Sequence, residues 1–525
     1  MPKLLEIALR PEEAASDKTI KKYISDKLSV PVDDISGFHI LKRSIDARSR
    51  QVKIRMHLTA FIKEKYVEPV VPQRKLDNVS SGREIYIAGC GPAGLFAAIR
   101  LIELGLKPVI IERGKDVKSR RRDLAAINKD GIVNPESNYC FGEGGAGTYS
   151  DGKLYTRSGK RGSIDKILQT FVQFGADPSI LCDAHPHIGT NKLPNIITAI
   201  REAILQCGGE IQFETKLTGI TTNKSGITGI YITRGTDEPI YIKCNHLLLA
   251  TGHSARDIFQ LLHQNNIYIE AKPLAIGVRI EHQQKIIDSI QYHNENRGEF
   301  LPPASYSLVH QSGNRGVYSF CMCPGGIIAP AATNEGEVVV NGWSPSKRNN
   351  PFANSGIVVS IQETDYKKYA SSGPLAAMKY QEEAEQKAYK SGGGNLRAPA
   401  QRMIDFIDKK TSSSLPVCSY HPGLTSVQLD DVLTPEISSA LREGLASFGK
   451  KMKGYYTNEA VLVGVESRTS SPVRIPRDPE LLMHTGTGGL FPCAEGAGYA
   501  GGIVSAAIDG ERCAEAIASY VTTLK

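Results

Sequence analysis

The sequence predicts an α/β protein whose largest domain is a Rossmann-like fold around a parallel sheet, and three observations predict it. Residues 84–88 form a short apolar run, a glycine-rich turn follows at 89–94, and a second apolar run ends at Glu112. A strand, a tight turn, a helix and another apolar strand make the βαβ unit of a sheet buried on both faces. A second glycine-rich turn near residue 500 opens the last helical segment, so we expect the chain to return to this domain at its end.

The length and the texture of the chain predict four segments. At 525 residues the chain is too long for one ordinary core. We expect a small α+β module at 1–78, the first part of the discontinuous nucleotide-binding domain at 79–265, an inserted mixed α+β substrate domain at 266–478, and the second part of the nucleotide-binding domain at 479–525.

The first 66 residues predict a β-α-β-β order. Residues 3–9 alternate like a strand, and Ile20, Tyr23, Ile24 and Leu28 fall on one face of a helix. Two more strands are expected at 38–45 and 51–61, joined by a turn. Residues 67–82 are rich in Pro, Ser and Asn, which is typical of a linker.

Further along, helical spacing over 193–209 is followed by strand-like runs up to Gly252. The segment between about 270 and 480 predicts strands at 274–280, 316–322 and 337–343 with one helix at 374–390.

Composition excludes some classes of protein. No window holds the roughly 18 to 20 uninterrupted apolar residues of a spanning helix, and the first residues turn polar early, so we expect no membrane segment and a cytoplasmic location. The ten cysteines include no CxxC pair, which predicts reduced thiols without a zinc ribbon. The net charge is +8, and residues 1–80 hold 16 Lys and Arg against 11 Asp and Glu. This asymmetry keeps a nucleic-acid partner open beside a solvated basic surface.

The glycine-rich turn points to a dinucleotide. Gly89 permits the tight turn, Gly91 lets the main chain approach a pyrophosphate, and Gly94 lets the helix pack on the sheet. Pro92 and Ala93 complete the turn, and the free N–H groups of the helix start favour an anion. Glu112, 23 positions after Gly89, is placed to accept the ribose hydroxyls of the adenosine and disfavours a 2′-phosphate.

The end of the chain favours FAD over NAD as the cofactor. Glu495 precedes a second glycine-rich turn about 400 residues after the first. We expect free N–H groups at Gly501, Gly502 and Ile503 to meet the N1/C2=O edge of a flavin and to stabilise its reduced form.

Four stretches carry a resemblance to a known family. GCGPAGLFAA, YCFGEGGAGTYSDGKL, LLLATGHSARD and GLFPCAEGAGYAGGIVSAAIDG resemble the uncharacterised FAD-dependent dehydrogenase family, within the glutathione reductase-like flavoproteins with two dinucleotide-binding domains. The likeness extends to KRSIDAR in the front module and to FCMCPGG, VVVNGWSPSKR and VESRTSSPVRIPRD in the middle. It implies FAD on a discontinuous domain, with an inserted domain beneath the flavin, and it supplies no substrate.

The resemblance also implies a set of cofactor-binding residues. Gly89, Gly91 and Gly94 bind the pyrophosphate, Glu112 binds the ribose, and the 144–148 segment passes the flavin. Leu217 offers main-chain groups to the adenine. Glu495 stands where the class usually has Asp, and Cys493 stands where a small residue is expected. The full expected set is Gly89, Gly91, Pro92, Ala93, Gly94, Glu112, Arg113, Gly145, Ala146, Gly147, Thr148, Lys153, Leu217, Thr251, Gly252, Glu495, Gly501, Gly502 and Ile503.

Candidates for chemistry are less specific, and each has a purely structural alternative. Cys321 and Cys323 are redox-active thiols beside the flavin, or buried small hydrophobes, because cysteines two apart on a strand are too distant for an unstrained disulfide. His253 is a proton donor or a loop anchor. Arg256 and Asp257 are expected to pair locally.

Two histidines and three arginines also have a functional and a structural interpretation each. His185 and His187 have the spacing of metal ligands but lack carboxylates or cysteines nearby in sequence, so we expect no metal. Arg468, Arg474 and Arg477 converge to clamp an anionic substrate, or are plain loop arginines.

The residues therefore predict an FAD-dependent oxidoreductase, a dehydrogenase that passes hydride between a small-molecule substrate or NAD(P)H and the flavin. NAD(P)H is expected only as a transient co-substrate, since no second strand-embedded glycine fingerprint follows. The alternative is an FAD-containing protein recruited to RNA by the basic front module, around the 42–50 turn with Lys53 and Arg55. A structural, non-redox FAD is a third possibility. The sequence leaves the substrate, the electron acceptor and the oligomeric state open.

Overall fold

A parallel sheet of five strands forms the centre of one half of the molecule in the computed structural model, which describes residues 2–156 and 159–523. The strand order is β22-β10-β4-β5-β6, and every neighbouring pair is parallel. The strands are β4 (Glu84–Ala88), β5 (Lys107–Ile111), β6 (Glu210–Gln212), β10 (Leu247–Leu249) and β22 (Leu490–Pro492). Because β22 comes from the end of the chain, segments some 400 residues apart complete one sheet, and the α/β class predicted from the sequence is confirmed.

The two faces of this sheet are covered differently. Ile85 and Ile87 pack with helices on one face, whereas Ala88 packs on the other with an antiparallel sheet and one helix. The helices of the first face are α3 (Pro92–Glu103), α5 (Ile164–Gln173), α6 (Leu193–Gln206) and α12 (Ile503–Thr523). The second face carries β7 (Thr215–Asn223), β8 (Gly226–Arg234), β9 (Ile240–Lys243) and α7 (Arg256–Gln264).

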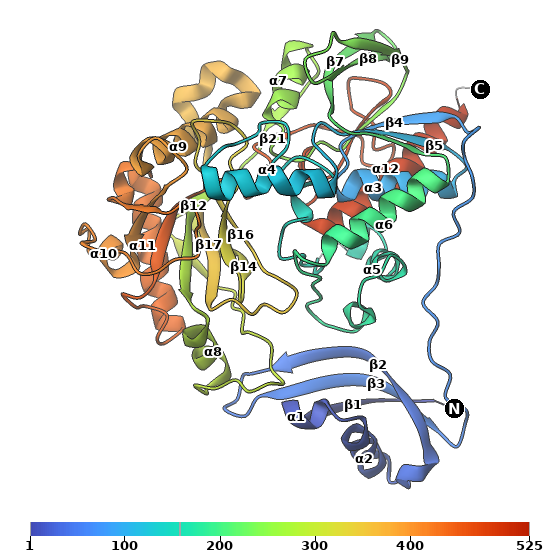
Figure 1. Cartoon of the computed structure of the whole chain (residues 1–525), viewed down its shortest axis with the longest axis vertical. Coiled ribbons are helices and arrows are strands. Elements are labelled where there is room, and N and C mark those ends of the chain that lie inside the picture. The colour runs from blue at the N-terminus through green and yellow to red at the C-terminus, as the bar shows by residue number, and fades with distance from the viewer. Residues whose placement is uncertain (1, 157–158, 524–525) are drawn as a thin grey trace.

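A mainly antiparallel sheet of seven strands forms the other half (Figure 1). Its order is β13-β14-β17-β12-β20-β18-β19, and only the last pair is parallel. The strands are β12 (Ala275–Gln283), β13 (Val309–Ser312), β14 (Arg315–Cys323), β17 (Phe352–Ser360), β18 (Ala398–Arg402), β19 (Leu424–Ser426) and β20 (Val461–Glu466). Helices α8 (Gln284–Tyr292), α9 (Ala376–Gly392), α10 (Met403–Ile407) and α11 (Pro435–Lys451) accompany it, with the pairs β15 (Ile327–Pro330) and β16 (Val340–Trp343), and β11 (Glu270–Ala271) and β21 (Val473–Arg474).

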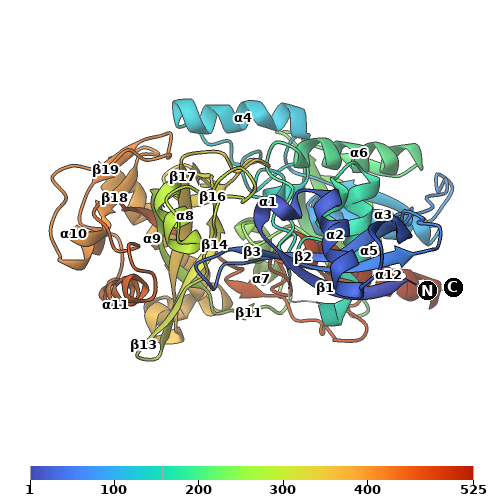
Figure 2. The same cartoon turned by 90° about the horizontal axis from the view of Figure 1, so that it is seen from below.

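The N-terminal module has the predicted β-α-β-β order. It consists of β1 (Lys3–Leu9), α1 (Pro11–Ala14), α2 (Asp17–Leu28), β2 (Ile35–Asp46) and β3 (Lys53–Ile62), with β3 in the middle of the sheet. The predicted helical face buries Ile20 and Ile24. The module lies below both halves with its helices on the outer side (Figures 1 and 2).

Two arginines fasten the module and the segment that follows it. The main chain of Arg43 bonds to Cys182 and Ala184, and its guanidinium pairs with Asp183 at 2.8 Å. Residues 63–83 contain no helix or strand, as expected of a linker. Arg74 nevertheless anchors this linker, because its buried guanidinium contacts Glu103 on α3, Thr170 on α5 and Glu511 on α12.

Several helices have no counterpart among the predicted elements. The longest of these are α4 (Val117–Asp130) and α11, and α4 starts at Asp116, whose carboxylate accepts from the N–H groups of Lys118 and Ser119. Short 3-10 turns occur at Val32–Asp34, Gly145–Gly147, Gly159–Arg161, Pro178–Leu181, Glu363–Leu375 and Leu429–Asp431, the fifth with a kink. Over the described chain, no helix has both the length and the apolar character that crossing a membrane requires.

Candidate cofactor site

The turn between β4 and α3 uses its three glycines in two ways. Gly89 has φ +105°, and a methyl there would overlap the carbonyl oxygen of Ala250, while a methyl at Gly94 would overlap that of Gly89. At Gly91 the nearest heavy atom to an added methyl is Cα of Gly145, 3.9 Å away. Gly89 and Gly94 are therefore required by packing, whereas a methyl at Gly91 would make only an ordinary van der Waals contact with the 144–148 loop.

Helix α3 begins beside this contact between Gly91 and the 144–148 loop. Gly91 is its N-cap and Pro92 its first residue, so the missing N–H of proline costs nothing there. The N–H groups of Ala93 and Gly94 lie in the first turn, where a helix offers no acceptor of its own. These groups and the positive end of the helix dipole make the helix start beside Gly91 suited to a phosphate.

The loop Gly144–Thr148 lies against the turn at Gly91. A methyl at Gly145 would lie 3.2 Å from Cα of Gly91, and a methyl at Gly147 would lie 3.1 Å from Ile503 on α12 and 3.5 Å from Pro92 on α3. Thr148 is buried and donates to the carbonyl of Glu143, whereas Ala146 is exposed. The loop thus contacts the starts of both helices, and its passage along a bound flavin, which the resemblance implies, stays a prediction.

Arg120 on α4 holds this loop, and the sequence analysis missed it. Its side chain is fully buried and donates to the carbonyl oxygens of Asn138, Tyr139, Glu143 and Gly145 at 2.8 to 2.9 Å. Burial lowers the pKa of the guanidinium. One arginine among four basic residues at 118–122 gives no signal in the sequence that would single it out.

Glu112 at the end of β5 joins three segments. Its carboxylate is 5% exposed and accepts from the N–H groups of Cys90 at 2.8 Å, Gly114 at 2.8 Å and Gly142 at 3.0 Å. The ribose contact stays a prediction, and these bonds give the residue a structural task as well. Arg113 beside it pairs with Glu136 and Asp257 and lies 4.2 Å from the ring centre of Phe141.

The start of α12 differs from the expectation of free N–H groups at Gly501 and Gly502. The N–H of Gly501 donates to the hydroxyl of Ser505 at 3.1 Å, and that of Gly502 donates to the carboxylate of Glu495. The physical reason is that a carboxylate is stabilised at the positive end of a helix dipole. A methyl at either glycine would have no heavy atom within 4 Å, so the space outside the helix start is open.

Glu495 also contacts the predicted histidine. Nδ1 of His253 lies 3.0 Å from its Oε2. Burial raises the pKa of Glu495, but the hydrogen bonds from His253 and Gly502 outweigh burial, and the net pKa is lowered. The two loops that carry these residues lie close together, since a methyl at Gly496 would fall 2.7 Å from the carbonyl oxygen of Gly252. Thr251 and Gly252 therefore stand beside the Glu495 loop.

Leu217 lies on β7 opposite Ile232, and its side chain is buried. The predicted role of its main chain toward adenine stays a prediction.

Lys153 reaches from the parallel-sheet half to the other half. Its ammonium lies 3.9 Å from Sγ of Cys321 and 3.8 Å from Sγ of Cys323 at the end of β14, and 3.2 Å from Asp151. Arg279 on β12 donates to the carbonyl of Cys321 at 2.8 Å. In a regular strand, cysteines two positions apart are too distant for an unstrained disulfide. Strand β14 is not regular here, because its register shifts between Phe320 and Cys323 and Cys321 has φ +45°.

The expected local pair of Arg256 and Asp257 is wrong. Arg256 is buried against Glu337 at 2.9 Å and Glu385 at 2.8 Å, and Asp257 pairs with Arg113 and Lys216. Neighbours on a helix point about 100° apart, so partners distant in sequence compete successfully for them.

Of the two interpretations left open for Arg468, Arg474 and Arg477, the structure does not support the anion clamp. Arg468 is buried among Thr333, Glu337 and Glu385, and Arg477 pairs with Asp509 at 2.6 Å. Arg474 lies over the ring of Tyr499 at 5.1 Å. Two of the three guanidinium groups are thus neutralised by buried carboxylates of this chain.

The two histidines of the 185–187 segment contact different partners. Nε2 of His187 bonds to the carbonyl of Ser346 at 3.1 Å, and the ring of His185 packs on Tyr155 at 4.9 Å. Among the described residues, Cys493, Asp509 and Cys513 approach one another within 4.8 Å, and the guanidinium of Arg477 donates to Asp509 and Cys513.

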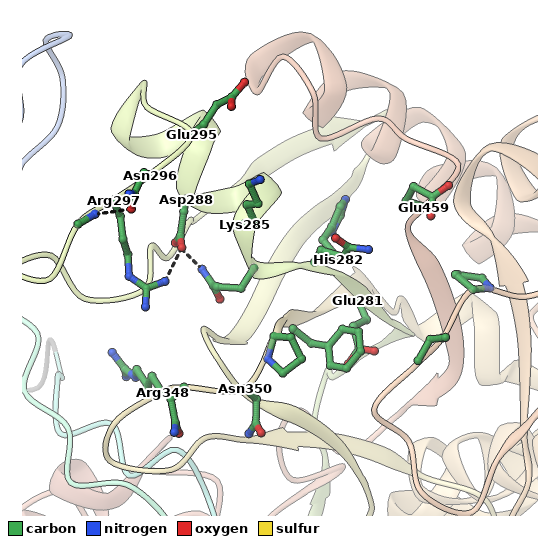
Figure 3. A pocket seen from close by; sticks show the side chains of 18 of the residues that line it. Glu281, His282, Lys285, Asp288, Glu295, Asn296, Arg297, Arg348, Asn350 and Glu459 are labelled. Atoms are coloured by element: carbon green, nitrogen blue, oxygen red, sulfur yellow. Dashed lines mark hydrogen bonds and ion pairs between the residues drawn. The ribbon is translucent and has the colours of Figure 1, made fainter.

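A polar cavity of about 1060 Å³ opens beside α8 in the second half (Figure 3). Asp288 in its wall accepts from Arg297 at 2.5 Å and from Gln284 at 2.8 Å. Arg348, on the opposite side, pairs with Asp151 at 2.6 Å. This cavity could not be predicted from the sequence, because the residues of its wall are spread between 281 and 459.

Comparisons with known proteins agree with a flavoprotein at a coarse level. Residues 273–469 match a family described as FAD-dependent protein, C-terminal domain-like, and residues 1–61 match a domain of unknown function, DUF8436. The class of glutathione reductase-like flavoproteins stays a prediction.

Solved structures give only weak likenesses. A geranylgeranyl bacteriochlorophyll reductase-like protein from Thermoplasma acidophilum is 10% identical, covers 84% of this chain and 80% of its own, and has a TM-score of 0.36. A variant of E. coli quinol fumarate reductase FrdA is 12% identical, with 85% and 71% covered and a TM-score of 0.34. A variant of halogenase PltM in complex with FAD is 11% identical, with 84% and 70% covered and a TM-score of 0.38. Scores this low say nothing of the reaction.

One relative matches over nearly the whole length. An uncharacterized protein of Clostridium beijerinckii is 41% identical over 517 residues, which is 95% of each chain. The chain belongs to the family of this clostridial protein.

Proposed function

We propose that the protein is an FAD-dependent oxidoreductase whose cofactor diphosphate lies at the start of α3, beside the contact of Gly91 with the 144–148 loop. The helix start is the observation that carries the proposal. The N–H groups of its first turn have no acceptor within the helix, and a methyl at Gly91 would meet no heavy atom closer than 3.9 Å. Main-chain N–H groups at a helix start are the usual ligands of a dinucleotide phosphate.

The residues present fit FAD. Glu112, at the end of the neighbouring strand, stands toward the ribose side, and the open space outside Gly501 and Gly502 leaves room for a ring system at the start of α12. FAD, when bound, supplies two-electron hydride chemistry. The chain itself has to bind, orient and shield it.

His253 and Glu495 are the pair proposed to hold a proton near that space. The lowered pKa of Glu495 keeps its carboxylate ionised, so it accepts from Nδ1–H of His253 at 3.0 Å. This fixes the tautomer and leaves Nε2 as the atom that accepts or returns a proton.

The substrate and the electron donor are proposed only as classes: a small molecule, with NAD(P)H as a transient donor. The RNA-associated alternative has no second observation in its favour. Three of the six cations of the basic turn pair with carboxylates of the protein: Arg43 with Asp183, and Arg48 and Arg55 with Asp46.

The test uses Gly91→Ala in the full-length protein. The methyl fits the folded chain but occupies space at the proposed phosphate position beside Gly91. We therefore expect the Kd for FAD to rise about 10- to 100-fold, equivalent to about 1–3 kcal/mol. FAD binding is measured by flavin fluorescence quenching and the fold by thermal unfolding without flavin.

Gly486→Ala is the matched control, because its methyl lies 3.7 Å from His484 in an exposed loop on another side of the sheet. Unchanged FAD affinity in Gly91→Ala, or a wild-type protein that takes up no FAD, would contradict the proposal. Anaerobic bleaching of the bound flavin by NADH, NADPH or a metabolite panel then identifies the donor.

A further inference from the structure

Two cysteines and two cations meet where the halves of the molecule touch. Cys321 and Cys323 close β14, Lys153 approaches both sulfurs within 3.9 Å, and Arg279 lies 3.4 Å from Sγ of Cys323. Of the two cations, Arg279 is fully buried and the Lys153 side chain is 37% exposed. Two cations beside two thiols require an explanation that packing alone does not give.

The strand is bent where the two thiols stand. Cys321 adopts φ +45° at the irregularity between Phe320 and Cys323, a conformation that a non-glycine residue rarely takes. Both sulfurs lie within 3.9 Å of the Lys153 ammonium, and Sγ of Cys323 donates to the carbonyl oxygen of Cys321 at 3.3 Å. Strain of this kind is typical of functional positions.

The electrostatics separate the roles of the two thiols. The hydrogen bond from Cys323, together with Lys153 and Arg279, lowers the pKa of Cys321 far below its usual range against the opposing effect of burial. The bond to Cys321 and burial raise the pKa of Cys323. Asp151 and Glu466 oppose the thiolate but are themselves paired with Arg348 and Arg279. Cys321 is partly exposed, whereas Cys323 is buried.

We propose that Cys321 and Cys323 form a redox-active dithiol that reduces a disulfide substrate. Cys321 is the attacking thiolate, Cys323 is the resolving thiol, and Lys153 positions the negative charge. A partly exposed attacking sulfur beside a buried one is the arrangement that this exchange needs.

The exchange balances without any further reagent. The Cys321 thiolate attacks one sulfur of the substrate R–S–S–R, forms a mixed disulfide and releases RS⁻. Cys323 gives its proton to that RS⁻ and attacks Cys321 Sγ, which releases a second RS⁻ and forms the Cys321–Cys323 disulfide. One thiolate, one thiol and one disulfide become one disulfide, one thiol and one thiolate.

Return to the dithiol takes two electrons and one proton. The inference rests on the proposed function at this point, because reduced FAD is the donor of that pair of electrons and that proton. The first experiment below does not depend on flavin, so the two proposals fail separately.

The first experiment equilibrates the full-length protein in glutathione redox buffers, alkylates the free thiols and analyses the peptide that contains Cys321 and Cys323. We expect a reversible loss of about 2 Da that follows the buffer ratio and excludes alkylation of both cysteines. Cys321→Ser and Cys323→Ser are expected to abolish it, and Cys207→Ser, the control at a partly exposed thiol on the other half, is expected to leave it unchanged.

The second experiment measures the alkylation rate of Cys321 by iodoacetamide against pH. The rate is expected to stay high down to a pH at which Cys207 no longer reacts, because burial raises the pKa of Cys207. Lys153→Gln is expected to slow alkylation of Cys321 about tenfold at pH 6 and to leave Cys207 unchanged.

The third experiment counts electrons in the FAD-loaded protein. Anaerobic dithionite titration of the oxidised protein is expected to consume about four electrons per flavin, and about two in Cys323→Ser. Two thiols that alkylate fully at every buffer ratio, or a wild-type titration that ends at two electrons, overturn the dithiol while the flavin proposal stands. A protein with the reversible disulfide but no FAD supports the dithiol and removes the proposed function.

Discussion

Single residues in this protein often take partners that their sequence neighbours do not suggest. Glu112 shows a residue with two tasks, since the carboxylate expected at a ribose also holds three main-chain N–H groups in place. Glu281 on β12 shows a carboxylate that forms no ion pair among the described residues. It accepts from the main-chain N–H and the hydroxyl of Ser419, and burial raises its pKa to about 7.

Glu281 predicts a dependence of stability on pH. The folded-state pKa lies above the ordinary value of 4.5, so the folded protein binds this proton more tightly than the unfolded chain does. Its contribution is complete below about pH 4.5 and is lost as the pH rises to 7, a fall of about 3 kcal/mol in the free energy of unfolding. Glu281→Gln removes the charge, accepts from the main-chain N–H of Ser419 through Oε1 and donates to the Ser419 hydroxyl through Nε2. We therefore expect it to be more stable than wild type at pH 8 and similar at pH 5.

Urea denaturation at pH 5, 6, 7 and 8 measures this difference. Glu459→Gln, an exposed residue of the same cavity, is the control. Parallel pH profiles for wild type and Glu281→Gln would show that the carboxyl is already ionised in the fold.

At the scale of elements, helix α12 connects the two glycine-rich regions. Its start receives the Glu495 carboxylate, and its middle lies directly on α3, because Gly510 leaves no space between the helix and the carbonyl of Ala93. The positions of both helix starts, and hence of the proposed phosphate and flavin sites, depend on this contact.

We therefore expect Gly510→Ala to destabilise the protein by about 1–3 kcal/mol, because the added methyl forces α12 away from α3. Thermal unfolding measures the loss. Gly501→Ala, just before the same helix, meets no heavy atom within 4 Å and is expected to unfold at the wild-type temperature. Equal melting temperatures for the two variants would mean that the helix contact adapts.

At the scale of the whole molecule, charged residues connect the two halves, the N-terminal module and the linker. Lys153 and Arg348 reach between the halves, Arg43 fastens the N-terminal module, and Arg74 fastens the linker. The Arg74 guanidinium is 6% exposed, and its partners on α3 and α12 are also mostly buried. The linker is therefore part of the packed structure of the parallel-sheet half.

Arg74→Ala is expected to lower the free energy of unfolding by about 3 kcal/mol, because it removes a cation from two mostly buried carboxylates. Among the described residues, Glu511 then keeps Lys166, and Glu103 keeps Lys166 and Arg100, as the cations within 4 Å. Trypsin cleavage within residues 63–83 should become faster, as followed by mass spectrometry. Lys75→Ala, at the neighbouring position with an 86% exposed side chain, provides the control. Equal cleavage rates in the two variants would contradict an anchoring role.

Local physical rules determined much of this protein from the sequence alone. Apolar runs of five residues, helical spacing and glycines that need a positive φ are properties of short segments, so the sequence predicted the βαβ unit, the front module and both glycine-rich turns. The segment 144–148 could be assigned to the site by resemblance.

Only the tertiary structure decided which distant side chains meet. The buried set of Arg256, Glu337, Glu385 and Arg468, and the contact of Lys153 with Cys321 and Cys323, join residues more than 80 positions apart. A buried charge takes whichever partner removes its desolvation penalty, and that choice depends on the packing of sheets rather than on spacing along the chain. The bend at Cys321 belongs to the same class, because the pairing of β14 with β17 sets it.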